Sequence, residues 1–220
     1  MRIAVSRSVS AALLEIAVMQ KPVRVVAIAA FIASCALPVF ANSNLATTRS
    51  ATALLDADAP DIRDPRQQHE LGVQYLQGDG VPRDEQKAFY WIHRAAEQGL
   101  PEAQASLGML YGKGYGVARD EAEAIRWFRK AAEQGSATGQ YNLGVAYAKG
   151  VGVAQDFVAA VKWLRQAAEQ GDASAQYNLG IAYANGDGVQ QDMSTALQWF
   201  QKAAQQGEPH ARAALQQLGR

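Results

Sequence analysis

Apolar residues recur every three or four positions along most of this chain, which is the spacing of a buried stripe on an α-helix. Residues 100–135 show the pattern best: Ala103 and Leu107 mark one stripe, and Trp127 and Phe128 mark a second. Glycines separate the two stripes, and glycine readily adopts the left-handed backbone that ends a helix and forms a turn. The pattern therefore predicts two helices joined by a short turn.

This helical pair repeats with a period of 36 residues. The pentapeptide Ala-Ala-Glu-Gln-Gly begins at residues 95, 131 and 167, and a variant with Gln in place of Glu begins at residue 203. Such a period is typical of a solenoid, in which each unit is stable only when stacked on its neighbours. We therefore predict an all-α fold, an α/α solenoid of four helix-turn-helix repeats with a C-terminal capping helix. The repeats are expected at residues 66–99, 100–135, 136–171 and 172–207, and the cap at 208–220.

Two further residue types keep the phase of the repeat. The second helix of each unit carries a tryptophan in phase with an alanine, so we expect all four to be core residues: Trp91, Trp127, Trp163 and Trp199. The first helix of each unit contains a glycine: Gly72, Gly108, Gly144 and Gly180. An interior helical glycine costs up to ~1 kcal/mol of helix propensity. Its presence in every unit predicts close packing that a side chain would obstruct.

Polar side chains precede the predicted helices as caps. Asp120 stands before the second helix of its unit, and Glu123 follows three residues later, which predicts a capping box. Aspartates at the equivalent positions predict the same N-cap in the other units: Asp84, Asp156 and Asp192. Ser136 and Asp172 are expected to cap first helices.

The N-terminal 41 residues resemble an export signal. A basic flank at Lys21 and Arg24 precedes an apolar run over residues 25–40, and small residues end the segment. The run is shorter than the ~20 residues of a membrane span. Met19 is a more natural start than Met1, so an 18-residue N-terminal extension is expected. Residues 42–65 contain few large apolar residues and are interpreted as a flexible linker. We expect an exported protein, periplasmic or secreted.

Cys35 introduces an alternative. It is the one cysteine of the chain and follows Ile-Ala-Ser, which resembles the lipobox of bacterial lipoproteins. Lipidation at Cys35 would make the protein an envelope-anchored lipoprotein. Since the repeats contain no cysteine, no disulfide framework supports them.

Charge and candidate chemistry exclude several classes of function. Outside residues 1–41 the chain has a net charge of −3 and no basic stripe, so no nucleic-acid partner is expected. The three histidines are His69, His93 and His210, and their spacing matches no metal-ligand motif. We find no nucleophile–base motif and no phosphate loop. The sequence thus predicts no catalytic residues, no metal and no cofactor.

The pattern Ala-x-Gln-Tyr-Asn-Leu-Gly-x-Ala-Tyr-x-x-Gly-x-Gly-Val-x-x-Asp, followed by Ala-x-x-Trp and Lys/Arg-x-Ala-Ala-Glu-Gln-Gly, closely resembles the Sel-one-like repeat (SLR) of the tetratricopeptide-like superfamily. The resemblance covers residues 67–207. It implies an adaptor or scaffold rather than an enzyme, with a role in envelope signalling or polysaccharide regulation. The alternatives are a lipoprotein scaffold of polysaccharide export and a cell-wall or β-lactam hydrolase. A cysteine-rich branch linked to β-lactam binding pairs cysteines within each repeat, which this chain lacks.

By the same resemblance, the first helices line a concave groove that would bind a protein or peptide partner. Asn142 and Asn178 lie one unit apart and would hydrogen-bond an extended peptide backbone. Tyr141 and Tyr177 are neighbouring candidates for interface anchors, and Lys149 would meet an acidic group. The alternative reading of these tyrosines and asparagines is consensus packing and solvation.

Overall fold

The structure is a computed structural model that describes residues 62–218. Within that range it contains nine helices and no strand. Their bounds are α3 (Pro65–Gln77), α4 (Glu85–Glu97), α5 (Pro101–Lys113), α6 (Glu121–Glu133), α7 (Ala137–Lys149), α8 (Phe157–Glu169), α9 (Ala173–Asn185), α10 (Met193–Gln205) and α11 (Pro209–Gln217). The predicted export signal, Cys35 and the linker up to residue 61 lie outside the described residues.

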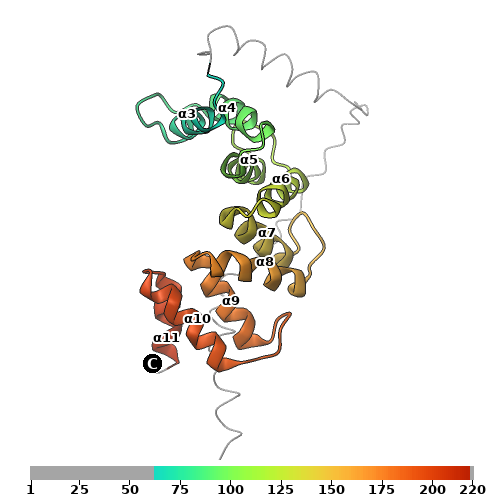
Figure 1. Cartoon of the computed structure of the whole chain (residues 1–220), viewed down its shortest axis with the longest axis vertical. Coiled ribbons are helices and arrows are strands. Elements are labelled where there is room, and N and C mark those ends of the chain that lie inside the picture. The colour runs from blue at the N-terminus through green and yellow to red at the C-terminus, as the bar shows by residue number, and fades with distance from the viewer. Residues whose placement is uncertain (1–61, 219–220) are drawn as a thin grey trace, which may run out of the picture.

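Consecutive helices pack as pairs, and each pair packs on the next, so that the array is elongated (Figure 1). The first helices of the units are α3, α5, α7 and α9, and the second helices are α4, α6, α8 and α10. Helices α5 and α7 also contact each other directly, which places first helices side by side along the array. α11 packs on α10 as the predicted C-terminal helix. The prediction of an all-α solenoid of four helical hairpins is confirmed.

The predicted N-caps are present, but the capping box is not. Asp120 Oδ1 accepts from the amide of Glu123 at 3.0 Å, as expected. The amide of Asp120, however, donates to the carbonyl of Tyr111 at 3.0 Å, and the Glu123 carboxylate accepts from Arg126. The same amide-to-tyrosine bond joins the two helices of the other units: Asp84 to Tyr75, Asp156 to Tyr147 and Asp192 to Tyr183. The reciprocal half of the box was a wrong prediction because this bond already satisfies the N-cap amide.

The Gly-x-Gly turn between the two helices forms a contact between units. Gly114 ends α5 in the left-handed conformation, with φ of 75°. Gly116 is also left-handed, and a Cβ atom there would lie 2.0 Å from the carbonyl oxygen of Glu85 in the preceding unit. At Gly80, in the first unit, a Cβ atom would meet nothing within 4 Å. The second glycine of the turn is therefore required where one unit packs on another.

The helix-interior glycines confirm the predicted packing role. A Cβ atom on Gly108 would lie 2.7 Å from two ring carbons of Phe128, and one on Gly144 would lie 2.8 Å from Cγ of Leu164. Gly72 and Gly180 meet their second helices at similar distances. Each first helix thus approaches its second helix at the glycine.

The tryptophans differ among themselves, which corrects the prediction that all four are core residues. Trp91 is 2% exposed. The other three are only partly buried and pack at the edges of the apolar clusters: Trp127, Trp163 and Trp199. A lysine ammonium lies over each of these rings, at 3.8 Å from the centroid for Lys130 and Trp127. Lys130 and Lys202 lie over the indole because each stands three residues after its Trp on the same helix face; Lys162 directly precedes Trp163.

A buried glutamine ladder, which the sequence analysis did not identify, links the units. Gln140 is 5% exposed, accepts from Gln170 Nε2 at 2.6 Å and donates to the carbonyl of Ala132 at 3.4 Å. The equivalent glutamine pairs lie at 2.6 to 2.8 Å: Gln68 with Gln98, Gln104 with Gln134 and Gln176 with Gln206. The exposed Gln of the Ala-Ala-Glu-Gln-Gly motif therefore bonds the buried glutamine of its own unit.

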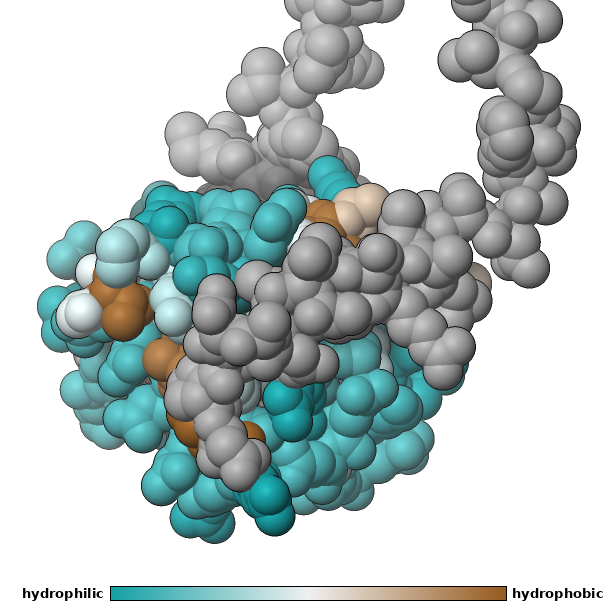
Figure 2. Space-filling model, turned by 90° about the horizontal axis from the view of Figure 1, so that it is seen from above, coloured by the Kyte–Doolittle hydropathy of each residue, from teal (hydrophilic) through white to brown (hydrophobic). Residues whose placement is uncertain are grey.

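The exposed surface at the N-terminal end of the array is mainly polar. Figure 2 looks onto the α3–α4 end of the array, and the described surface visible there is largely hydrophilic with scattered apolar residues. Within residues 62–218, no helix has the length and hydropathy needed to cross a membrane.

Candidate functional site

An open groove of about 600 Å³ lies across α7, α8, α9 and the start of α11. We call it the C-terminal groove. It is lined by four of the five residues that the sequence suggested for partner binding: Tyr141, Lys149, Tyr177 and Asn178. Apolar side chains from α7, α8 and α9 line it as well, among them Val145, Phe157 and Ile181. Four residues that the sequence analysis did not single out as binding residues complete its polar lining: Ser174, Asp187, Glu208 and His210.

Neighbouring first helices are linked by side-chain contacts between residues 37 positions apart. His69 Nε2 lies 2.9 Å from Ser106 Oγ on the next first helix. Two units along the array, the Tyr141 hydroxyl is hydrogen-bonded to the side chain of Asn178, and also to Ser174. The offset follows from the 36-residue period, because neighbouring first helices lie side by side and the side chain crosses to the adjacent position. Asn178 and Tyr141 therefore lie together at the wall of the C-terminal groove.

Asn142 is not brought to the C-terminal groove. Its Nδ2 donates to the carbonyl of Thr138, in its own helix, at 2.8 Å. The 37-residue offset pairs Asn142 with Ala105, which has no polar side-chain atom. The predicted pair of asparagines thus has two different environments, with Asn178 in the groove wall and Asn142 bonded to its own helix.

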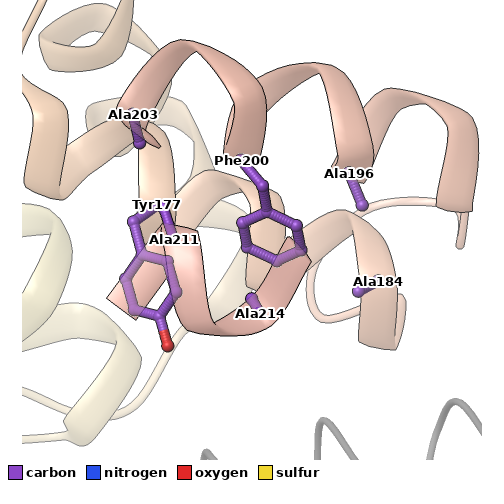
Figure 3. Packing of buried hydrophobic residues seen from close by; sticks show 7 residues of the cluster. All are labelled: Tyr177, Ala184, Ala196, Phe200, Ala203, Ala211 and Ala214. Carbon is purple, nitrogen blue, oxygen red and sulfur yellow. The ribbon is translucent and has the colours of Figure 1, made fainter. Parts of the chain in front are cut away.

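Tyr177 is buried rather than displayed at the surface. Its side chain is 3% exposed, and its ring lies 5.7 Å from the rings of Phe200 and His210. Figure 3 shows the ring beside Phe200, with the hydroxyl pointing away from the labelled cluster of Ala and Phe side chains. This hydroxyl is the one buried side-chain polar atom within residues 62–218 that has no hydrogen-bond partner. The 37-residue offset pairs Tyr177 with Ala214, which has no hydrogen-bonding side-chain atom.

The two tyrosines of the C-terminal groove are held in the protonated form. Burial raises the pKa of the Tyr177 hydroxyl above 10.0, and the Glu208 carboxylate raises this pKa further. Burial also raises the pKa of Tyr141, as does Asp172, while the bonds to Asn178 and Ser174 oppose the shift. At neutral pH both hydroxyls are therefore available as hydrogen-bond donors.

Lys149 is exposed at the end of α7, and two carboxylates share its groove. Asp187 Oδ2 accepts from the side-chain amide Nδ2 of Asn185 at 3.1 Å, and Glu208 Oε1 accepts from the backbone amide of His210 at 3.2 Å. No salt bridge within the described residues involves either carboxylate. The groove thus contains one lysine and two unpaired negative charges.

His69 lies at the other end of the same row of contacts. It is partly buried, and its Nε2 lies within hydrogen-bonding distance of Ser106 Oγ. Burial lowers its pKa below 6.5, and Glu102 opposes this shift. Among the residues that the structure describes, no group of three or more His, Cys, Asp or Glu side chains could hold a metal ion.

Comparison with known families identifies the repeat. The sequence pattern of the Sel1 repeat matches residues 68–100, 101–136, 137–172 and 173–208. The chain belongs to the Sel1 repeat family. Sel1 repeat proteins are commonly protein-interaction scaffolds and are typically not catalytic.

Solved structures of Sel1 repeat proteins are similar to this chain in sequence and fold. A Sel1 repeat protein from Oxalobacter formigenes is 38% identical with a TM-score of 0.69, over 80% of this chain and 74% of that one. A protective antigen of uropathogenic Escherichia coli strains, which displays an SLR fold, is 41% identical with a TM-score of 0.64. That match covers 77% of this Sel1 repeat chain but only 35% of the antigen. No curated protein shows significant sequence similarity to the chain.

Proposed function

We propose that this Sel1 repeat protein is an exported adaptor that binds a protein or peptide partner through the C-terminal groove, in the periplasm or at the cell envelope. The observation that carries the proposal is that the groove gathers side chains that vary between units on a scaffold that repeats. The row of positions that begins at His69 continues as Ala105, Tyr141 and Tyr177. The buried glutamines, by contrast, are the same in all four units. Positions whose residue type varies along the repeat are suited to recognition.

The composition of the groove favours a polypeptide. Val145 and Ile181 offer apolar surface, and Asn178 and Tyr141 offer hydrogen-bonding groups at the wall. Repeated first helices that present such a mixture suit an extended segment, whose main chain needs hydrogen bonds while its side chains need pockets. A role in envelope signalling or polysaccharide regulation follows the family resemblance and the predicted export signal.

Affinity capture from an envelope extract tests the proposal. The double variant Lys149→Ala/Asn178→Ala changes the C-terminal groove. The double variant Lys113→Ala/Asn142→Ala makes the same two changes one unit earlier, at residues that do not line it. We expect a partner that is recovered by the wild type and the control but lost by the groove variant, with far-UV circular dichroism unchanged in all three. Equal recovery by both variants would overturn the groove as the binding site.

A second candidate is a lipoprotein scaffold of polysaccharide export, which is favoured by Cys35 and its lipobox-like flank. Palmitate labelling of the expressed protein distinguishes the two. Labelling that disappears in Cys35→Ser would support the lipoprotein. Absence of labelling, together with recovery of the protein in the periplasmic fraction, would favour the soluble exported adaptor.

A further inference from the structure

The buried hydroxyl of Tyr177 lacks a partner for a reason that lies in the repeat. Buried polar groups in folded proteins are nearly always hydrogen-bonded, so an exception requires an explanation. The equivalent hydroxyl of Tyr141 is satisfied by Asn178, but the position that would serve Tyr177 is Ala214. Since Tyr177 lines the C-terminal groove, a molecule bound there is positioned to supply the missing partner.

A neutral hydrogen-bond acceptor suits this hydroxyl. The phenol is protonated at neutral pH, since burial and Glu208 raise its pKa further from neutrality, so its O–H is available to donate. A ligand carboxylate would be repelled by Glu208 and Asp187, whereas a main-chain carbonyl carries no net charge. The exposed side chain of His210 lines the same groove, with its ring 5.7 Å from the Tyr177 ring.

The charges of the groove select the neighbouring residue of the ligand. Asp187 is bonded to a neutral amide and Glu208 to a backbone amide, so neither carboxylate has a cationic partner among the described residues. A lysine or arginine of the ligand would supply one, with charge-assisted hydrogen bonds. The apolar surface of Ile181 and of Phe157, which is 40% exposed, suits an aliphatic or aromatic side chain next to it.

We propose, on the basis of the function above, that the C-terminal groove selects an extended peptide in which a lysine or arginine flanks an apolar residue. A main-chain carbonyl of this peptide accepts a hydrogen bond from Tyr177, and the basic side chain pairs with Asp187 and Glu208. Tyr177 is thus a specificity-determining donor. Its hydroxyl is available to a ligand because Ala214 has no hydrogen-bonding side-chain atom.

The test uses the full chain and a phage-displayed library of random 12-residue peptides, followed by fluorescence polarisation with synthetic copies of the selected peptides. We expect enrichment of a basic residue beside an apolar one. Tyr177→Phe should weaken binding about fivefold, the effect of one hydrogen bond. Because the hydroxyl has no partner in the free chain, Tyr177→Phe should not lower the urea midpoint. The control Tyr147→Phe removes a hydroxyl outside the groove that Arg129 donates to at 3.0 Å, so it should lower the midpoint and leave binding unchanged.

The charge selection is tested by Asp187→Asn. Replacing the basic residue of a selected peptide with norleucine should weaken its binding to the wild type about tenfold and to Asp187→Asn less. The matched control is Asp79→Asn, the same turn position in the first unit, outside the groove. It should behave as the wild type.

The outcomes separate this inference from the proposed function. If no peptide is enriched, or if the enriched peptides bind Lys149→Ala/Asn178→Ala as well as the wild type, the groove is not a peptide site and both proposals fail. If peptides require the groove but show no basic preference, or bind Tyr177→Phe with unchanged affinity, the inference fails and the proposed function stands.

Discussion

A pair of glycines in one helix tests how the units are packed. Gly108 and Gly112 both lie inside α5, one turn apart. A Cβ atom on Gly108 would meet two ring carbons of Phe128 at 2.7 Å and the carbonyl oxygen of Ala124 at 3.0 Å. A Cβ atom on Gly112 would meet only the Ala124 side chain, at 3.7 Å, which is an ordinary contact. The substitutions Gly108→Ala and Gly112→Ala therefore add the same methyl group to one helix in two environments.

The expected stabilities follow from two opposing terms. Each alanine gains helix propensity, up to ~1 kcal/mol. At Gly108 the close contacts force α5 and α6 apart, and such overpacking costs ~1–3 kcal/mol. Gly112→Ala should therefore stabilise the chain by up to ~1 kcal/mol, and Gly108→Ala should lie ~1–3 kcal/mol below it. Because propensity is common to both variants, the difference between them isolates the packing cost.

Urea unfolding followed by far-UV circular dichroism measures this difference. The slopes of the two transitions should agree, so that the midpoints report stability directly. Thermal unfolding should give the same order, with ~2–4 °C for each kcal/mol in a domain of this size. A midpoint for Gly108→Ala equal to or above that of Gly112→Ala would refute the close helix approach at this glycine.

Three further predictions concern other contacts. Gln140→Met should lower the free energy of unfolding by ~0.5–1.5 kcal/mol in urea titrations, because it removes the hydrogen bonds that the buried Gln140 side chain makes with Gln170 and with the Ala132 carbonyl; an unchanged midpoint would contradict the role of the ladder. Trp91→Ala should cost ~3–5 kcal/mol, as for a buried aromatic, whereas Trp127→Ala should cost less because its ring is only partly buried; equal losses would contradict this order. Burial lowers the pKa of His69 below 6.5, so the unfolded chain binds the proton more readily and stability is lost as pH falls below 6.5. Between about pH 7.5 and about pH 5.5, wild-type protein should therefore lose more stability than His69→Gln, and parallel curves would contradict it.

The repeat made most of the fold predictable. Helix starts, turn glycines and the apolar stripe all agree in register over four units, so local signals and the period indicate the same structure. The glycine contacts of α5 could be predicted because a costly residue kept in every unit implies a constraint. The tryptophans could not be placed from periodicity alone. A helical phase shows which face a side chain occupies, but Trp91 and Trp127 share a phase and differ in burial.

Polar contacts between helices were less predictable. The sequence showed that Gln140 and Gln170 recur, but not that their amides meet at 2.6 Å, because that pairing depends on the separation of two helices. The same holds for Asp187 and Glu208, which reach the C-terminal groove from a turn and from the start of α11. Neither carboxylate lies on a first helix, the element on which the sequence predicted the binding residues.

Side chains of the first helices that have no partner across the 37-residue offset explain why Tyr177 is the strongest candidate for recognition. Asn142 and Tyr177 both face an alanine across the 37-residue offset, Ala105 in one case and Ala214 in the other. Asparagine has a short side chain, so Asn142 reaches back to the carbonyl of Thr138 and is satisfied within its own helix. The tyrosine hydroxyl stands at the end of a rigid ring, beyond the reach of its own backbone, and remains without a partner. An alanine across the offset thus leaves both side chains without a partner on the neighbouring helix. Asn142 is satisfied within its own helix, whereas the Tyr177 hydroxyl remains a donor that a bound molecule can satisfy.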